Sequence, residues 1–208
     1  VFSEKKQNLD KKDAVNKTKF YLNQAVKRQL VSDVPVGAFL SGGLDSSSIV
    51  AMAVKHNKNI NCFSIETSSG MEDGMTDDLP YAKEVAKYLG VDLSIIPISS
   101  KKMCDDFTKM IRELDEPISD PAVFNLKYIC QLARKQGIKV LLSGAGGDDL
   151  FTGYRRHKAI TYEKYWNFAP ISIKKNLEKV SNLLDQRNAK YRKISKFLSG
   201  NLLDEDER

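Results

Sequence analysis

Hydrophobic positions in this 208-residue chain alternate between helical and strand spacing. Apolar residues recur every third or fourth position over 13–31, which predicts an amphipathic helix. The short apolar run Val34–Leu40 contains β-branched residues and predicts a buried strand. Asp and Ser side chains then precede the apolar run Ile49–Val54, as N-capping residues precede a helix. The opening region therefore predicts helix, strand, tight turn and helix.

The alternation continues further along the chain. The expected strands are Ile60–Ile65, Val91–Ile98 and Ile138–Leu142. The expected helices are Leu79–Leu89, Lys101–Leu114 and Pro121–Gln136, and Gly90 and Gly137 stop the first and the last of them. Strands that alternate with helices of this length form a mostly parallel sheet with helices on both faces. The predicted fold class is α/β, doubly wound.

Three segments are expected along the chain. Residues 1–12 are expected to be a linker or the remnant of a missing N-terminal region, and residues 13–160 to form one α/β domain. Beyond Tyr154 the pattern is helical and basic, without a further strand. We therefore expect residues 161–208 to form a helical extension that is truncated.

Composition narrows the class of protein. The apolar runs are shorter than the about 20 residues that cross a bilayer, and residues 1–30 lack the apolar core of a signal peptide. We therefore expect a cytoplasmic protein. The net charge of +6 is spread over both ends without interleaved aromatic residues, which favours a solvated surface over a nucleic-acid interface. The cysteines are expected to be reduced packing residues: Cys62, Cys104 and Cys130.

The first candidate site is the loop Ser41-Gly42-Gly43-Leu44-Asp45-Ser46-Ser47. Glycines let the backbone approach a ligand, and the amides at the start of the following helix favour an anion. The loop lacks the lysine and spacing of a Walker motif. A carboxylate beside phosphates implies a bridging Mg²⁺, which points to Asp45. The alternative is that Asp45 or Ser46 merely caps the helix.

A second Ser-Gly motif follows the last predicted strand, Leu141-Leu-Ser-Gly-Ala-Gly-Gly-Asp-Asp-Leu-Phe-Thr-Gly-Tyr-Arg-Arg156. Open parallel sheets bind ligands beyond the carboxyl ends of their strands, where both motifs are expected. The first motif resembles the pyrophosphate loop of the N-type ATP pyrophosphatases (PP-loop superfamily, adenine nucleotide alpha hydrolase-like fold). The second resembles Ser-Gly-Glu-Gly-x-Asp-Glu-Leu-Phe-x-Gly-Tyr of the glutamine-hydrolysing asparagine synthetases of the B type.

The resemblance implies site residues at the matching positions. Those implied to hold the β and γ phosphates of ATP lie in the first loop: Ser41, Gly42, Gly43, Leu44, Asp45, Ser46 and Ser47. Those implied to flank the adenine, largely through backbone groups, end adjacent strands: Leu40 and Ile65. Those implied to meet the α phosphate or the acyl adenylate are Ser143 and Gly144. Asp45 and Asp148 are implied Mg²⁺ ligands, and Arg155 and Arg156 an added positive charge.

The reaction implied by the resemblance consumes ATP with Mg²⁺. The side-chain carboxylate of aspartate is adenylated, pyrophosphate leaves, and ammonia then displaces AMP to give asparagine. A glutaminase domain is expected in the full-length chain to supply the ammonia. The resemblance implies that this domain begins with a cysteine, and since the first residue here is Val1 we expect it to be absent from this chain. A homodimer is left open.

Ala145 departs from the family pattern, which usually has Glu at this position. The resemblance implies that this Glu helps in the ammonia step, and a methyl group cannot accept a proton. Either Asp148, Asp149 or Glu116 takes that role, or the chemistry differs, or the chain is weakly active. The first alternative is an amidotransferase of the same family that acts on a carboxylate of a sugar, peptide or β-lactam precursor. The others are a tRNA-modifying adenylase and a non-catalytic nucleotide-binding domain.

Overall fold

The computed structural model describes residues 10–67, 78–116, 118, 120, 122–154, 157, 170–184 and 188–200. The chain divides into two compact units, Val1–Ala145 and Gly146–Arg208. Each unit is described by itself below. The division falls ahead of the domain boundary expected at residue 160, and residues next to that boundary lie outside the described part of the chain.

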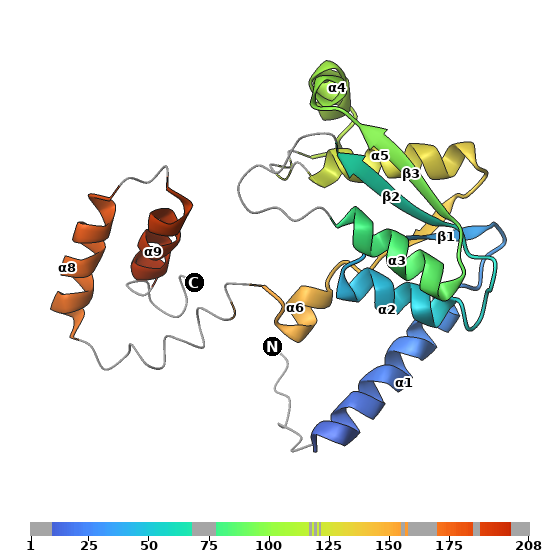
Figure 1. Ribbon diagram of the computed structural model, residues 1–208, viewed down its shortest axis with the longest axis horizontal. Coiled ribbons are helices and arrows are strands. Elements are labelled where there is room, and N and C mark those ends of the chain that lie inside the picture. The colour runs from blue at the N-terminus through green and yellow to red at the C-terminus, as the bar shows by residue number, and fades with distance from the viewer. Residues whose placement is uncertain are drawn as a thin grey trace. The chain divides into compact units, whose positions relative to one another are not determined.

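The first unit alternates helices and strands (Figure 1). Its helices are α1 (Lys11–Gln29), α2 (Leu44–Ala53), α3 (Leu79–Leu89), α4 (Ser100–Arg112) and α5 (Ala122–Lys135). Its strands are β1 (Val36–Phe39), β2 (Cys62–Thr67), β3 (Leu93–Ile98) and β4 (Val140–Leu142). The helices and strands predicted over this region are confirmed, with small shifts of their bounds. Gly90 ends α3 in the left-handed conformation, with φ of 66°.

The strands form one parallel sheet in the order β3-β2-β1-β4. From β1 the chain moves outward through β2 to β3, and it later returns to place β4 on the other side of β1. The strand order therefore reverses between β1 and β4. In open α/β sheets this reversal marks the crevice where ligands bind.

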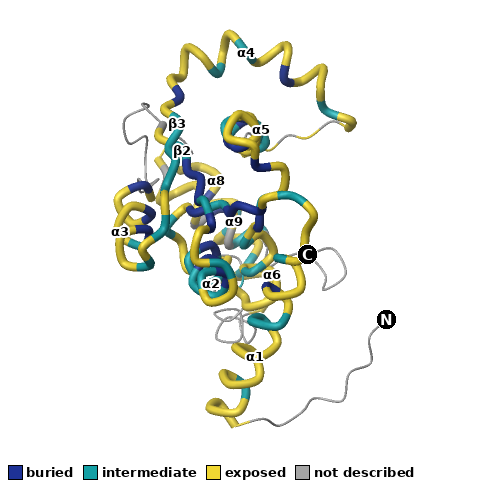
Figure 2. The backbone as a smooth tube through the Cα atoms, turned by 90° about the vertical axis from the view of Figure 1, so that its right-hand side faces the viewer, coloured by how far each residue is buried: buried dark blue, intermediate teal, exposed yellow. Residues whose placement is uncertain are grey.

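Helices cover both faces of the sheet. Since side chains alternate along a strand, neighbouring strand residues pack against helices on opposite faces. Ala38 and Cys62 share one hydrophobic cluster with residues of α1, α2 and α3. Phe63 packs on the opposite face with Ile129 and Ala133 of α5. Figure 2 shows this burial along the strands and the inner sides of the helices, while α1 and α4 are exposed for most of their length. The doubly wound α/β prediction is confirmed.

The prediction for the cysteines is wrong in part. All three thiols are free. Cys62 is fully buried in β2, and burial raises the pKa of its thiol to about 12, which keeps it neutral. Cys104 and Cys130 are exposed instead. On α4 the inward positions belong to Met103 and Met110, so Cys104 falls beside the apolar stripe and faces solvent.

The second unit contains α6 (Gly147–Phe151), α8 (Ile171–Asn182) and α9 (Ala189–Gly200) among its described residues. Helices α8 and α9 pack together, and the Ser195 hydroxyl donates a hydrogen bond to Asn182 Oδ1 at 2.7 Å. The described part of this unit has no strand, as expected. Across the described residues of both units, every helix is too short or too polar to cross a bilayer.

Candidate functional site

The loop after β1 is held in shape by two of its own serines. The backbone N–H of Ser41 donates to Ser46 Oγ at 3.2 Å, and Ser46 Oγ donates to the Gly43 carbonyl at 3.2 Å. The hydroxyls of Ser41 and Ser46 lie 3.0 Å apart. Because the Ser46 proton goes to Gly43, Ser41 is the donor in that pair. Ser46 is 8% exposed, so its hydroxyl shapes the loop from inside.

Helix α2 begins at this loop without a side-chain cap. Its N-cap is Gly43, and neither Asp45 nor Ser46 accepts a hydrogen bond from the first turn. Asp45 lies half-buried within that turn, Leu44 is exposed, and Ser47 Oγ is shielded from solvent without a partner in the described chain. Asp45 therefore does not cap helix α2. Uncapped amides at a helix start favour an anion.

The second Ser-Gly motif lies directly against the first. Strands β1 and β4 are neighbours, with Ala38 opposite Leu142. A Cβ atom on Gly144 would lie only 2.7 Å from the backbone nitrogen of Ser46 and 2.8 Å from the carbonyl carbon of Asp45. The absence of a side chain at Gly144 is thus what allows the turn after β4 to reach the start of α2. Within the first unit, the turn at Gly144 and the loop after β1 therefore lie against each other at the carboxyl edge of the sheet.

Ser143 occupies the exposed side of the turn after β4. Its hydroxyl accepts a hydrogen bond from the Ala145 backbone nitrogen at 3.1 Å. The hydroxyl proton of Ser143 has no acceptor within the described chain, so it can be donated to a bound group. The Ala145 side chain is exposed beside it and adds no polar atom to the site.

The first turn of α3 is a third neighbour of the site, which the sequence patterns did not reveal. Gly42 has a φ of 85°, and a Cβ atom there would lie 2.5 Å from the Ala82 nitrogen and 2.7 Å from Tyr81 Cβ. This contact joins segments far apart in the chain. The sequence pattern predicts a helix over Leu79–Leu89, and a helix prediction carries no signal of this packing.

Leu40 directly follows β1, and Ile65 lies on the neighbouring strand β2. The Leu40 nitrogen donates to the Phe63 carbonyl at 2.9 Å. Its side chain is fully buried in the core on the face of α2, whereas Ile65 packs toward α5. Both side chains therefore pack in the hydrophobic core, and only the backbone groups of Leu40 and Ile65 are available to contact a base.

The remaining predicted residues lie in the second unit or beyond the described residues. Asp148 is an exposed residue of the short helix α6, and its carbonyl accepts from the Gly153 nitrogen at 3.0 Å. A Cβ atom on Gly153 would collide with the Asp148 carboxylate, so this carboxylate is folded over the glycine. Asp149 lies on the same helix. Arg155 and Arg156 fall outside the described residues.

The donor set fits a magnesium ion that is held together with phosphates. No group of three His, Cys, Asp or Glu side chains within the described ranges could hold a metal by protein ligands alone. Mg²⁺ commonly takes one or two carboxylates and completes its shell with substrate phosphates and water. The Asp45 carboxylate in the first turn of α2 meets that requirement.

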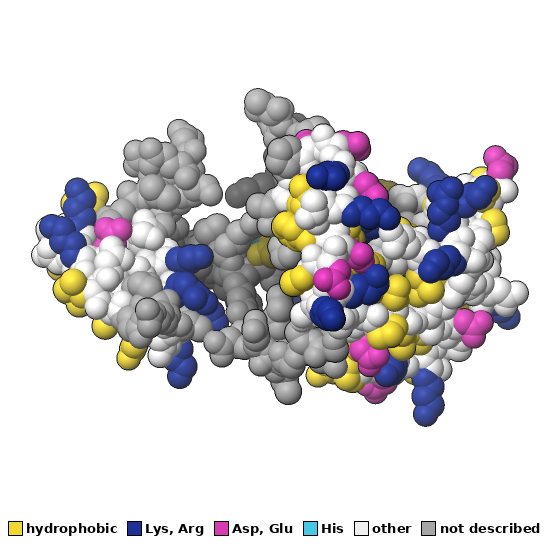
Figure 3. Space-filling view, turned by 90° about the horizontal axis from the view of Figure 1, so that it is seen from above, with side chains coloured by type: hydrophobic (Ala, Val, Ile, Leu, Met, Phe, Trp, Pro, Cys, Tyr) yellow, Lys and Arg dark blue, Asp and Glu magenta, His cyan; other side chains and the backbone are white. Residues whose placement is uncertain are grey.

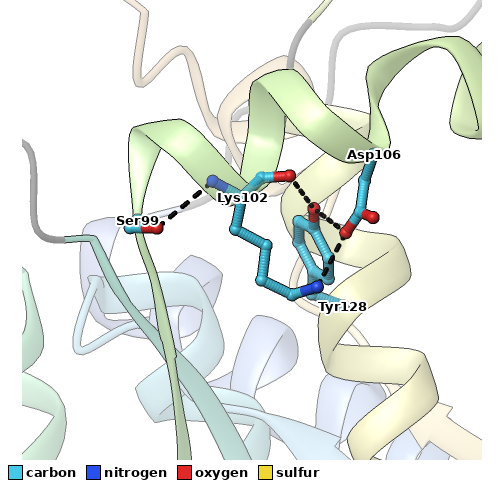
Figure 4. A network of polar contacts seen from close by, with 4 residues as sticks. All are labelled: Ser99, Lys102, Asp106 and Tyr128. Atoms are coloured by element: carbon cyan, nitrogen blue, oxygen red, sulfur yellow. Dashed lines mark hydrogen bonds and ion pairs between the residues drawn. The ribbon is translucent and has the colours of Figure 1, made fainter.

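A second polar cluster lies between α4 and α5, and it contains no residue of either motif (Figure 4). The Tyr128 hydroxyl donates to Asp106 at 2.8 Å, and Lys102 contacts the same carboxylate at 2.9 Å. The hydrogen bond from Lys102, followed by that from Tyr128, lowers the pKa of Asp106. Desolvation, together with the bond to Asp106, raises the pKa of Tyr128 to about 12. This cluster joins two helices.

Basic side chains of the first unit do not gather into one patch on the face shown at the right of Figure 3. There they lie among Asp, Glu and hydrophobic side chains. A nucleic-acid interface needs a continuous basic stripe or patch. The described residues on this face form no such stripe.

Comparison with known proteins gives a family match over residues 18–207, to the model described as asparagine synthase. Asparagine synthetase [glutamine-hydrolyzing] 1 of Bacillus subtilis is 34% identical over 162 residues, which cover 78% of this chain and 25% of that protein. The amidase chyE of Penicillium rubens is 30% identical over 152 residues, 66% of this chain and 22% of that protein. The chain thus spans about a quarter of the length of such relatives.

Among solved structures, the glutamine-dependent NAD+ synthetase from Acinetobacter baumannii in complex with ADP has a TM-score of 0.47 and 22% sequence identity. The match covers 73% of this chain and 29% of that one. This TM-score is too low to identify a common fold, so the fold class stands on the strand order and the placement of the helices.

Proposed function

Because this chain belongs to the asparagine synthase family, we propose that it binds ATP at the carboxyl edge of β1 and β4 and adenylates a carboxylate. The observation that carries the proposal is the close approach of Gly144 to Asp45 and Ser46. This approach brings the turn after β4 against the loop after β1, whose glycines and serines suit phosphate binding. Both lie where the strand order reverses, which is where α/β sheets bind ligands.

The β and γ phosphates bind at the start of α2. The uncapped amides of the first turn supply hydrogen-bond donors there, and the positive end of the helix dipole adds to the attraction. Asp45 would hold Mg²⁺ together with the phosphates, and the ion would supply positive charge at the leaving pyrophosphate. Asp148 as a second metal ligand and Arg155 as an added positive charge are predictions from the family resemblance. The adenine lies between the backbones of Leu40 and Ile65.

The chemical step needs positioning and charge neutralisation and no protein nucleophile. An oxygen of the substrate carboxylate attacks the α phosphorus, and the bond to the bridging oxygen of the β phosphate breaks, which releases pyrophosphate. The Ser143 hydroxyl and the backbone of Gly144 hold the α phosphate in place. Ammonia then attacks the acyl carbon, the bond from this carbon to the AMP oxygen breaks, and ammonia gives up a proton.

Aspartate is the proposed carboxylate, and ammonia from a glutaminase domain of the full-length chain is the proposed nitrogen donor. Incubation with ATP, Mg²⁺, aspartate and ammonia is expected to yield AMP, pyrophosphate and asparagine in equal amounts. Omission of aspartate is the control and should abolish pyrophosphate release. Formation of ADP and phosphate in place of AMP and pyrophosphate would refute the adenylation chemistry.

A second candidate is an amidotransferase acting on another carboxylate. It is favoured by Ala145, which leaves the turn after β4 without the carboxylate usual in the family. The similarity to an amidase of Penicillium adds support for a different acyl substrate. A panel of sugar, peptide and β-lactam-type carboxylates, assayed for pyrophosphate release beside aspartate, separates the two candidates. Release with aspartate alone would exclude this second one.

A further inference from the structure

Glu66 lies at the same edge of the sheet as the phosphate loop, one strand away. Phe39, the last residue of β1, is opposite Phe63 of β2, and β2 continues to Thr67, so Glu66 lies beyond the end of β1 at this edge. Adjacent parallel strands are about 4.8 Å apart. Glu66 is therefore carried by the strand next to β1, beyond the point where β1 gives way to the loop.

Glu66 also lies on the same face of the sheet as α2 and α3. Side chains alternate along a strand, and Phe63 and Ile65 pack toward α5. Cys62 packs toward α2 and α3, and Glu66 follows it at an even spacing. On this face the first turn of α3 closes against Gly42. Glu66 thus shares its edge and its face with the loop.

The Glu66 carboxylate has no hydrogen-bond or salt-bridge partner in the described part of the chain, and its side chain is exposed. A carboxylate repels a triphosphate unless a cation lies between them. The phosphates are already drawn toward the uncapped start of α2. The charge of Glu66 therefore favours the arrangement in which the uncharged base, and not the phosphates, faces β2.

We propose that Glu66 determines the choice of base, with its carboxylate accepting a hydrogen bond from the exocyclic 6-amino group of adenine. A 6-oxopurine presents an acceptor at the same place, so two acceptors would face each other and binding would weaken. The inference rests on the proposed binding of ATP at this edge. It assigns Glu66 a role in specificity that is separate from the chemistry at the phosphates.

The test compares ATP with ITP, which differs from it at the 6-position of the purine. Affinities are measured with Mg²⁺ by isothermal titration for the wild type and for Glu66→Gln. The wild type is expected to prefer ATP by about tenfold or more. The amide of glutamine can turn to accept from a 6-amino group or donate to a 6-oxo group. The preference of Glu66→Gln for ATP over ITP should therefore fall to about twofold, mainly because the variant binds ITP better.

Glu84→Gln is the matched control, because Glu84 is an exposed glutamate on α3 away from its first turn. It should keep the wild-type ratio of affinities. An unchanged ratio in Glu66→Gln, with ATP still bound, overturns the role of Glu66 alone. Loss of the Mg²⁺ dependence of binding in Glu66→Gln also overturns it, because Glu66 would then be a metal ligand. Absence of any nucleotide binding by the wild type refutes the proposed function itself.

Discussion

Helices α2 and α4 both start just past the carboxyl end of a parallel strand, yet their first turns differ. At α4 the N-cap is Ser99, whose hydroxyl accepts a hydrogen bond from the Lys102 nitrogen at 3.2 Å. At α2 the N-cap is Gly43, which has no side chain to accept one. Serines are present beside α2, but Ser46 bonds back to the Gly43 carbonyl. The start of α4 is therefore capped by a side chain, and the start of α2, called open below, has no side-chain cap.

The difference shows what makes a strand end a binding site. Both helices follow a strand of the same parallel sheet, but α4 runs across the direction of α2, so their dipoles point differently (Figures 1 and 2). Of these two helices, only α2 lies at the reversal of strand order and lacks a side-chain cap. Its hydroxyls are used to fix the loop, so an anion would meet donors that are already oriented. Oriented donors reduce the entropy cost of binding.

The largest effect is expected for Gly144→Ala, which fills the contact between the two motifs. The added methyl group would lie 2.7 Å from the Ser46 nitrogen and displace the open start of α2. We expect ATP affinity to fall about a hundredfold and the free energy of unfolding by about 1–3 kcal/mol, as for overpacked sites. Titration with ATP and urea unfolding measure the two quantities.

Gly43→Ala is the steric control, because a Cβ atom there would meet only Ser41 Oγ at 3.4 Å. Its free energy of unfolding should change by less than about 0.5 kcal/mol. If Gly144→Ala were as stable as this control and bound ATP normally, the two motifs would not form one site.

A smaller effect is expected for Asp45→Asn, which tests the metal at the open helix start. The neutral amide binds Mg²⁺ more weakly, so ATP affinity in the presence of Mg²⁺ should fall about tenfold. Without Mg²⁺ the affinity should stay the same or rise, because a charge that repels the phosphates is gone. Asp33→Asn, at an exposed site after α1, should change neither value. Equal losses with and without Mg²⁺ would remove Asp45 from the metal site.

Ser46→Ala and Ser99→Ala compare the open and the closed helix start directly. Ser99→Ala removes an N-cap and should cost about 0.5–2 kcal/mol of stability without changing ATP affinity. Ser46→Ala removes a buried hydroxyl with three hydrogen-bond contacts and should cost about 1–3 kcal/mol. It should also weaken ATP binding, because the loop loses its shape. Thermal unfolding and nucleotide titration of both variants provide the comparison, and normal ATP binding by Ser46→Ala would contradict it.

The smallest effect concerns the polar cluster behind α4 and appears only at high pH. Tyr128 has a pKa of about 12 in the folded protein, above its ordinary value of 10.0. The neutral phenol therefore stabilises the fold fully below pH 10, and this contribution is lost as the pH rises toward 12. Tyr128→Phe should remove this part of the decline in stability and leave ATP affinity unchanged. Unfolding followed between pH 9 and 11 measures it, and an unchanged decline would exclude Tyr128 as its source.

Much of the fold follows from local patterns in the chain. Gly90 and Gly137 end helices where the chain turns left-handed, and the apolar runs become strands. The contact of Gly144 with α2 depends on the pairing of β4 with β1, which no local pattern encodes. The spacing of the motifs also cannot separate a serine that binds a ligand from one that braces the loop, since Ser46 suits both. Burial distinguishes them only once the chain is folded.

The central claim is that the open start of α2 and the turn at Gly144 together hold pyrophosphate. The most direct measurement is a competition titration, in which pyrophosphate with Mg²⁺ displaces ATP from the protein. We expect pyrophosphate to compete with an affinity within about tenfold of that of ATP, and AMP to bind at least about tenfold more weakly. Bound ATP that pyrophosphate cannot displace would contradict the account.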